Sequence, residues 1–295
     1  MHFAMGFRKA LLLPVLALCA CAGHKTFCPQ DYQVDFPEAL RFAEKAALAY
    51  APPDSVRREA CGKDSCYFFK GETTATRSFL LIDDSARVQW IGFRGTASLS
   101  DVRLDADYTQ REDSVLGMYL HRGFASAARD HYRLLLPKLK PGYPVYITGH
   151  SLGGAVAVIT GLYLRKQGFA VKCYTFGQPK VTNGKGARIA DSLDLVRFLN
   201  GKDLVALVPP LDWKPGAKLG GYEHFGREVA LLPGTGFECL QKHFPKRNDP
   251  SAWWDNARRE ALEDHLLSGY LLKLKGIIDA QAHAQAQTQA LTTGH

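Results

Sequence analysis

A chain of 295 residues can bury one large hydrophobic core, so we expect one main domain with short extensions and not two domains. The hydrophobic content of 46% is typical of a globular protein. A net charge of +8 is compatible with contact to anionic lipid headgroups, or simply with solubility. No basic cluster is interleaved with aromatic residues, which excludes nucleic acid as an expected partner.

The first segment, residues 1–20, has the pattern of an export signal. Arg8 and Lys9 precede an uncharged run that is too short to span a bilayer. The run ends in Leu-Cys-Ala-Cys21, which resembles the lipobox of bacterial lipoproteins, with Cys21 as the acylated first residue. Ordinary cleavage after Ala20 or Ala22 is the alternative. We therefore expect a cell-envelope protein held on a membrane surface by lipidated Cys21, in the periplasm or at the outer membrane, or else a secreted protein.

An exported protein with several cysteines is expected to form disulfides. Beyond Cys21 the cysteines are Cys28, Cys61, Cys66, Cys173 and Cys239. Cys173 lies in an apolar strand-like segment and is expected to be a buried free thiol. Of the three pairings open to the other four, we expect a local Cys61–Cys66 bond and a long-range Cys28–Cys239 bond. No cysteine and histidine spacing resembles a zinc site, so no metal is expected.

After a linker over residues 21–34, the first expected elements are a helix and a β-hairpin. Residues 35–38 read Asp-Phe-Pro-Glu, an acidic start with an early proline that is typical of a helix N-terminus. The helix is expected to stop at Pro52-Pro53. Residues 77–82 and 87–93 are rich in β-branched and aromatic residues and flank a polar turn, which predicts the hairpin.

Two segments of different character follow the hairpin. Residues 98–121 begin polar and acidic, which indicates either a mobile lid beside an active site or a surface loop. Residues 123–139 have the periodicity of an amphipathic helix, and Pro141-Gly142 then turns the chain into the next strand.

The central motif of the chain is YPVYITGHSLGG at residues 143–154. It combines an apolar strand with the pattern G-x-S-x-G, in which glycines allow the close approach that a strand-to-helix turn demands. Residues 155–163 continue as an apolar helix, so the backbone N–H of Leu152 lies at a helix N-terminus, where negative charge is favoured. This context favours Ser151 as a nucleophile over Ser151 as an ordinary turn residue.

Strands are also expected at residues 171–176 and 195–199, and a final helix begins near residue 264. Alternating strands and helices around a G-x-S-x-G turn predict an α/β fold of the α/β-hydrolase type, with a mostly parallel central sheet and helices on both faces. The expected organisation is a signal peptide at 1–20, a linker at 21–34, the hydrolase domain at 35–276 and a flexible Ala/Gln-rich tail at 277–295.

A serine hydroxyl is a weak nucleophile near neutral pH and needs a histidine base that is oriented by a carboxylate. In α/β-hydrolases the acid and then the histidine follow the serine, on loops at the carboxyl ends of strands. Asp203 lies just beyond the strand at 195–199, which favours it as the acid. The competing carboxylates are Asp191, Asp194 and Asp212. For the base, the order along the chain leaves both His265 and His224 open.

Several blocks together resemble the class 3 lipases, the fungal-type triacylglycerol lipase family. They are WIGFRGTAS at 90–98 with Asp101 and Asp105, HRGF at 121–124, TGHSLGG at 148–154, YTFGQPK at 174–180, residues 200–210, GYEH at 221–224, and Asp264-His265. The blocks occur in the order of the family and extend over most of residues 35–275.

The resemblance implies a role for each matching residue. Ser151 corresponds to the nucleophile, Asp203 to the acid and His265 to the base. Thr96 and the backbone N–H of Leu152 correspond to the oxyanion hole. His224 and His150 match family positions of a structural kind, which favours His265 as the base. The region after Thr96 corresponds to the family's lid, but residues 98–108 are acidic here, where the lids of fungal lipases are more apolar.

The resemblance implies hydrolysis of lipid esters through an acyl-enzyme, of the triacylglycerol lipase or esterase type, with no metal or organic cofactor. Phospholipase A1 or lysophospholipase activity with the same three residues is the alternative, because an envelope protein meets phospholipids first. Acyl transfer to another acceptor uses the same residues. A binding protein without turnover is disfavoured, because the serine, acid and base are all present.

Overall fold

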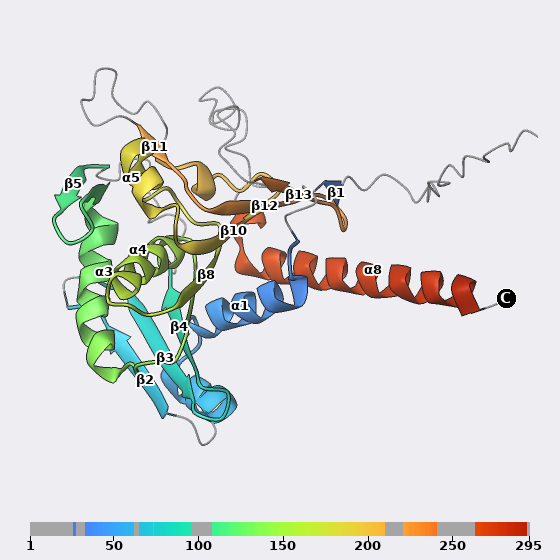
Figure 1. Ribbon diagram of the computed structural model, residues 1–295, viewed down its shortest axis with the longest axis horizontal. Coiled ribbons are helices and arrows are strands. Elements are labelled where there is room, and N and C mark those ends of the chain that lie inside the picture. The colour runs from blue at the N-terminus through green and yellow to red at the C-terminus, as the bar shows by residue number, and fades with distance from the viewer. Residues whose placement is uncertain are drawn as a thin grey trace, which may run out of the picture.

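The computed structural model describes residues 26–27, 33–61, 65–72, 74–95, 108–209, 221–240 and 263–293. These residues form a central nine-stranded sheet and a smaller four-stranded sheet (Figure 1). The large sheet runs in the order β1 (Thr26–Phe27), β13 (Phe237–Leu240), β12 (Arg227–Leu231), β10 (Asp194–Asn200), β8 (Val171–Phe176), β7 (Val145–His150), β4 (Val88–Arg94), β3 (Arg77–Asp83) and β2 (Ser65–Lys70). Strands β4, β7, β8, β10 and β12 are mutually parallel. The antiparallel pairs are β3 with β4, β2 with β3, and β13 with β12. The expected α/β class with a mostly parallel sheet is confirmed.

Helices cover both faces of the large sheet (Figure 1). On one face, α1 (Phe36–Leu48) and α8 (Leu267–Thr293) pack on β8, β10 and β12 through a shared apolar cluster. On the other face lie α3 (Arg122–Leu135), α4 (Leu152–Lys166) and α5 (Gly184–Ala190), which share a second cluster with β4 and β7. Short helical turns are α2 (Pro53–Val56), η1 (Arg57–Cys61), η3 (Leu136–Lys138) and η4 (Val205–Leu207).

Local sequence explains the two helices nearest to the central motif. Helix α1 begins where expected, because Asp35 Oδ1 accepts a hydrogen bond from Glu38 N at 2.7 Å and caps the helix. Helix α4 is apolar on all sides, and every residue from 153 to 164 is buried. A helix of this kind is stable only between other layers, so it lies between the sheet and α3. Its N-terminus therefore lies in the protein interior.

The expected hairpin is confirmed as β3 and β4, which pair antiparallel around a turn at residues 84–87. The smaller sheet corrects the expectation of a lid or surface loop over residues 98–121. Its order is β11 (Tyr222–Glu223), β9 (Thr182–Asn183), β6 (Met118–His121) and β5 (Gln110–Asp113), so residues 110–121 form a second hairpin. Met118 and Leu120 are buried and anchor it. Residues 98–107 lie outside the described residues.

The C-terminal segment is also different from expectation. A flexible Ala/Gln-rich tail is expected from residue 277, and in the structure α8 continues as helix to Thr293. Alanine and glutamine both have high helix propensity, which explains the continuation. Residues 279–292 are exposed, and this half of α8 extends away from the body (Figure 1). None of the helices within the described ranges combines the length and hydropathy that a membrane span requires.

The cysteine expectations are confirmed where they can be followed. Cys61 and Cys66 form a disulfide, and Cys173 is a buried free thiol. Burial raises the pKa of the Cys173 thiol well above its usual value, so the group stays protonated. Cys239 is disulfide-bonded, while its expected partner, Cys28, lies outside the described residues.

Candidate active site

Ser151 occupies a strained turn between β7 and α4. Its backbone has φ 58° and ψ −134°, a combination that costs energy in a residue with a side chain. The flanking glycines are required by contact: a Cβ on Gly149 would lie 2.4 Å from Gly153 C, and one on Gly153 would lie 2.4 Å from Phe93 O. Ser151 itself is buried, with 2% of its surface exposed. This is the geometry that the G-x-S-x-G spacing predicts.

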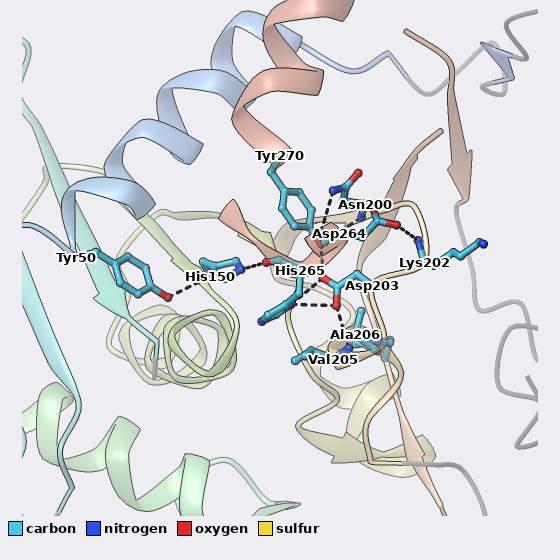
Figure 2. A network of polar contacts seen from close by, with 11 residues as sticks. Tyr50, His150, Asn200, Lys202, Asp203, Val205, Ala206, Asp264, His265 and Tyr270 are labelled. Carbon is cyan, nitrogen blue, oxygen red and sulfur yellow. Dashed lines mark hydrogen bonds and ion pairs between the residues drawn. The ribbon is translucent and has the colours of Figure 1, made fainter. Parts of the chain in front are cut away.

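Asp203 and His265 form a buried pair on two loops that are far apart in sequence. Asp203 follows the carboxyl end of β10, and His265 precedes α8. His265 Nδ1 lies 2.9 Å from each carboxylate oxygen of Asp203, and each residue exposes only 1% of its surface. Figure 2 shows His265 between Asp203 and His150, the residue before Ser151. The fold thus brings the three predicted residues to one region.

The Asp203 contact determines which nitrogen of His265 carries the proton. An ionised carboxylate accepts hydrogen bonds and cannot donate them. His265 Nδ1 is therefore the donor, and Nε2 holds the lone pair. Within the described part of the chain, Nε2 of His265 and Oγ of Ser151 are both buried and have no hydrogen-bond partner. Buried polar atoms are usually paired, and exceptions tend to have a functional cause. The histidine therefore presents a basic nitrogen inside the protein.

Two further donors hold the Asp203 carboxylate. Val205 N donates to Oδ1 at 2.9 Å, and the Tyr270 hydroxyl donates to Oδ2 at 2.5 Å (Figure 2). Burial and the neighbouring carboxylate raise the pKa of Tyr270 well above its usual value, so its hydroxyl remains a donor. Donors on both oxygens fix the orientation of the carboxylate.

The main chain around His265 is held by its neighbours. Asn200 Nδ2 donates to Asp264 O at 2.8 Å, and Lys202 N donates to Asp264 Oδ2 at 2.8 Å. His150 Nε2 lies 2.6 Å from His265 O, so this nitrogen donates to the carbonyl. These three bonds fix the loop that carries His265 against the ends of β7 and β10 (Figure 2).

His150 stays neutral in this arrangement. Its Nε2 is a donor, so its Nδ1 accepts the hydroxyl of Tyr50 at 2.9 Å. Burial, and then the nearby His265, lower the pKa of His150 to about 3. Burial raises the pKa of Tyr50 to about 12. Between these values both groups are uncharged, which agrees with a packing role for His150.

Other candidates from the sequence lie elsewhere. His224 Nε2 lies 2.6 Å from Ala206 O, and Asp203 pairs with His265 instead. Asp194 lies at the opposite end of β10, where it pairs with Arg227. Leu152 is the first residue of α4, so its N–H is among the groups that a helix leaves without an intrahelical acceptor. Residues Cys21, Thr96 and Asp212 lie outside the described residues.

Several supporting residues have no clear signal in the sequence. Tyr50, Asn200 and Tyr270 reach the site only through tertiary packing. Gly177 follows β8 with φ 57°, and a Cβ there would lie 2.5 Å from Asp203 Oδ2 and 3.0 Å from His265 Nδ1. A glycine directly after a buried strand is the one signal that points to this close approach.

Comparisons with known proteins agree with this geometry. Residues 90–213 match the family described as lipase (class 3). The chain is 29% identical over 173 residues to the secreted mono- and diacylglycerol lipase 1 of Fusarium solani, which covers 56% of this chain and 50% of that protein. The chain spans about half the length of the curated relatives it matches first.

Solved structures match over more of the chain. Lipase II from Rhizopus niveus superposes with a TM-score of 0.65 and 25% identity, covering 78% of this chain and 92% of that one. A triacylglycerol lipase whose catalytic centre is a serine protease triad has a TM-score of 0.58 and 25% identity, and the match covers 67% of this chain and 80% of that one. With the strained serine turn, these similarities show that the chain has the α/β-hydrolase fold of the solved lipase structures, and that its residues 90–213 are similar to the class 3 lipase family.

Proposed function

We propose that this protein is a serine carboxylic ester hydrolase that acts on lipid esters, with Ser151 as nucleophile, His265 as base and Asp203 as acid. The observation that carries the proposal is the buried Asp203–His265 pair, which leaves Nε2 of His265 without a hydrogen-bond partner among the described residues, in the region of the strained Ser151. Acylglycerol esters are the proposed substrates, because the matched relatives include mono- and diacylglycerol lipases and a triacylglycerol lipase.

The proposed reaction proceeds through an acyl-enzyme. His265 Nε2 takes the proton of Ser151 Oγ while Oγ attacks the ester carbonyl carbon. The tetrahedral intermediate collapses, the bond to the alcohol oxygen breaks, and His265 returns the proton to the leaving alcohol. Water, activated by the same nitrogen, then releases the fatty acid and restores Ser151. Asp203 stabilises the imidazolium that forms in each step and holds its tautomer.

The proposed oxyanion hole combines the backbone N–H of Leu152 with Thr96. Leu152 begins α4, where the helix dipole and the unpaired N–H groups favour negative charge. A preorganised donor of this kind lowers the free energy of the transition state by about 3 kcal/mol. The part assigned to Thr96 rests on the sequence alone.

Replacing Gly177 by alanine is expected to lower kcat for a soluble ester by about 100-fold or more, because displacing a catalytic group by even 1 Å has effects of that size. The new Cβ would lie 2.5 Å from Asp203 Oδ2 and force the pair apart. Gly168→Ala is the matched control, since Gly168 also has positive φ, at 90°, but no heavy atom of the described residues lies within 4 Å of the added Cβ. Both substitutions share the backbone cost of about 1 kcal/mol. Equal activity in the two variants would contradict the assignment of this contact.

The substrate proposal is tested with purified protein on matched ester series. We expect hydrolysis of mono-, di- and triacylglycerols of graded chain length, measured by release of fatty acid, at rates above those for phosphatidylcholine of the same chains. A preference for the phospholipid would instead identify a phospholipase A1 or lysophospholipase. No hydrolysis of any ester by the folded protein would contradict the proposal.

Export of the chain is also proposed, in agreement with relatives that are described as secreted lipases. Lipid attachment at Cys21 rests on the lipobox-like residues 18–21 alone. It predicts that the protein from the membrane fraction carries an acylated N-terminal cysteine by mass spectrometry. Release of a Cys21→Ser variant from the membrane would support anchoring, and an unmodified N-terminus in the wild type would exclude it.

A further inference from the structure

A cavity of about 330 Å³ lies beside the first three strands of the large sheet, on the side covered by the end of α1 and by α2. Its described lining is mainly apolar and includes Leu48, Ala51, Val56, Phe68 and Phe79. The cations in it are Lys70, Arg77 and Arg94, and the described lining residues include no carboxylate. The Asp203–His265 pair does not belong to it.

The strand register separates the cationic and apolar lining into two neighbouring rows. Lys70 pairs with Arg77, and Arg77 pairs with Arg94, across β2, β3 and β4. Residues that are directly opposite in a sheet have side chains on the same face, so these three cations lie side by side. The adjacent row is Phe68, Phe79 and Gly92. A Cβ on Gly92 would lie 2.3 Å from Phe79 Cε1, so the Phe79 ring occupies the space over Gly92.

Like charges that are directly opposite across strands repel each other, so the cation row is unfavourable without an anion. Among the described residues, no carboxylate forms an ion pair with Lys70, Arg77 or Arg94. Arg94 instead lies over the ring of Tyr50, at 5.9 Å from its centroid. Lys70 and Arg77 are exposed, so this end of the cavity is open to a ligand from solvent.

The cation row ends close to the nucleophile. Arg94 is followed by Gly95, where a Cβ would lie 2.6 Å from Tyr50 Oη, 2.7 Å from His150 O and 3.2 Å from Ser151 Cβ. A molecule bound at Arg94 therefore lies one residue along the chain from Gly95, where a side chain would collide with the neighbourhood of Ser151. The cavity lies on the α1 and α2 side of the sheet, whereas α4 lies on the opposite face.

We propose that this cavity binds a single-chain fatty carboxylate, the acid that the proposed reaction releases. The carboxylate lies against the row of Lys70, Arg77 and Arg94, since guanidinium groups match carboxylates in shape and charge. The alkyl chain lies along Phe68 and Phe79, toward Leu48 and Val56. The volume is at the lower end of the range for small-molecule pockets, which suits one chain better than two. The identity of the ligand rests on the proposed function, but the binding does not require turnover.

Binding is measured by isothermal titration calorimetry of decanoate, below its aggregation concentration, into the Ser151→Ala protein. We expect saturable binding of one equivalent. Adding Lys70→Glu with Arg77→Glu is expected to weaken binding about tenfold or more, since a charged contact of this kind changes affinity by at least that factor. Ala51→Leu, which fills the apolar part without a change of charge, is expected to weaken binding as well. Arg133→Glu, an exposed arginine on α3, is the charge control and is expected to leave the affinity within about twofold.

Two other amphiphiles with the same chain separate the ligand classes. Decyltrimethylammonium is expected to bind at least tenfold more weakly than decanoate, because its head is repelled by the cation row. Decyl phosphate tests whether the site prefers a phosphate head to a carboxylate head. If decyl phosphate binds more tightly than decanoate, the carboxylate assignment is overturned. No saturable decanoate binding, or equal affinity in the Lys70→Glu, Arg77→Glu variant, would overturn the site. Since these proteins lack Ser151, either outcome is independent of whether the wild type hydrolyses esters.

Discussion

Replacing Ser151 by alanine is expected to lower kcat for acylglycerol and p-nitrophenyl esters by about 10⁴-fold or more, the loss seen when a triad serine is removed. Without Oγ no acyl-enzyme forms, and only the oxyanion donors and substrate binding remain. Initial rates of fatty acid or p-nitrophenol release measure the effect. The wild type is also expected to gain the mass of one fluorophosphonate on Ser151, and the variant none.

The Ser151 variant is expected to fold normally. Alanine keeps the Cβ, so the backbone strain at φ 58° is unchanged, and in the part of the chain that the structure describes Oγ has no hydrogen-bond partner to lose. Thermal unfolding checks this, and the midpoint is expected to stay within about 3 °C of the wild type. Ser192→Ala, in an exposed turn where Ser192 Oγ accepts a bond from Arg165, is the matched control for activity. Turnover that persists in the Ser151 variant would eliminate this serine as the nucleophile.

Replacing Asp203 by asparagine is expected to lower kcat by about 10³-fold to 10⁴-fold. The amide is nearly the same size, but it no longer stabilises the His265 imidazolium and permits the opposite tautomer, with the proton on Nε2. That nitrogen then cannot take the proton of Ser151. The decrease is measured as kcat over a range of pH, because a tautomer change is not restored by raising the pH.

Two controls separate charge from local packing in the Asp203 experiment. Asp264→Asn is the same substitution one residue before His265, and the new amide oxygen can still accept the bond from Lys202 N that helps to hold the loop. It is expected to change kcat by less than about threefold, the effect of an exposed polar bond. Tyr270→Phe removes one donor from Asp203 and leaves the charge, so a decrease of about tenfold is expected. An Asp203→Asn loss no larger than that of Tyr270→Phe would contradict the proposed role of the acid.

Local sequence patterns predicted much of the fold, because caps, hairpin turns and strands depend mainly on residues that are adjacent in the sequence. The Asp35 cap, the hairpin around residues 84–87 and the strand at 171–176 are all found where expected. Two segments have a secondary structure that the sequence analysis did not predict, for opposite reasons. Residues 110–121 form strands because of pairing within a second sheet, which a polar composition does not reveal. Residues 277–293 are helical because of high intrinsic propensity, although they bury little surface.

The sequence by itself determined the serine turn. The steric requirement lies within five residues, because a side chain at Gly149 or Gly153 would collide with nearby backbone atoms. It also indicated the α/β class, through alternating strands and helices. The tertiary structure decided which histidine meets Asp203, because residues 203 and 265 come together only when α8 packs beside β10. It also decided how Tyr50 and His150 support His265, across separations of 100 residues or more. Contacts at such distances depend on the packing of whole layers, and no local pattern encodes them.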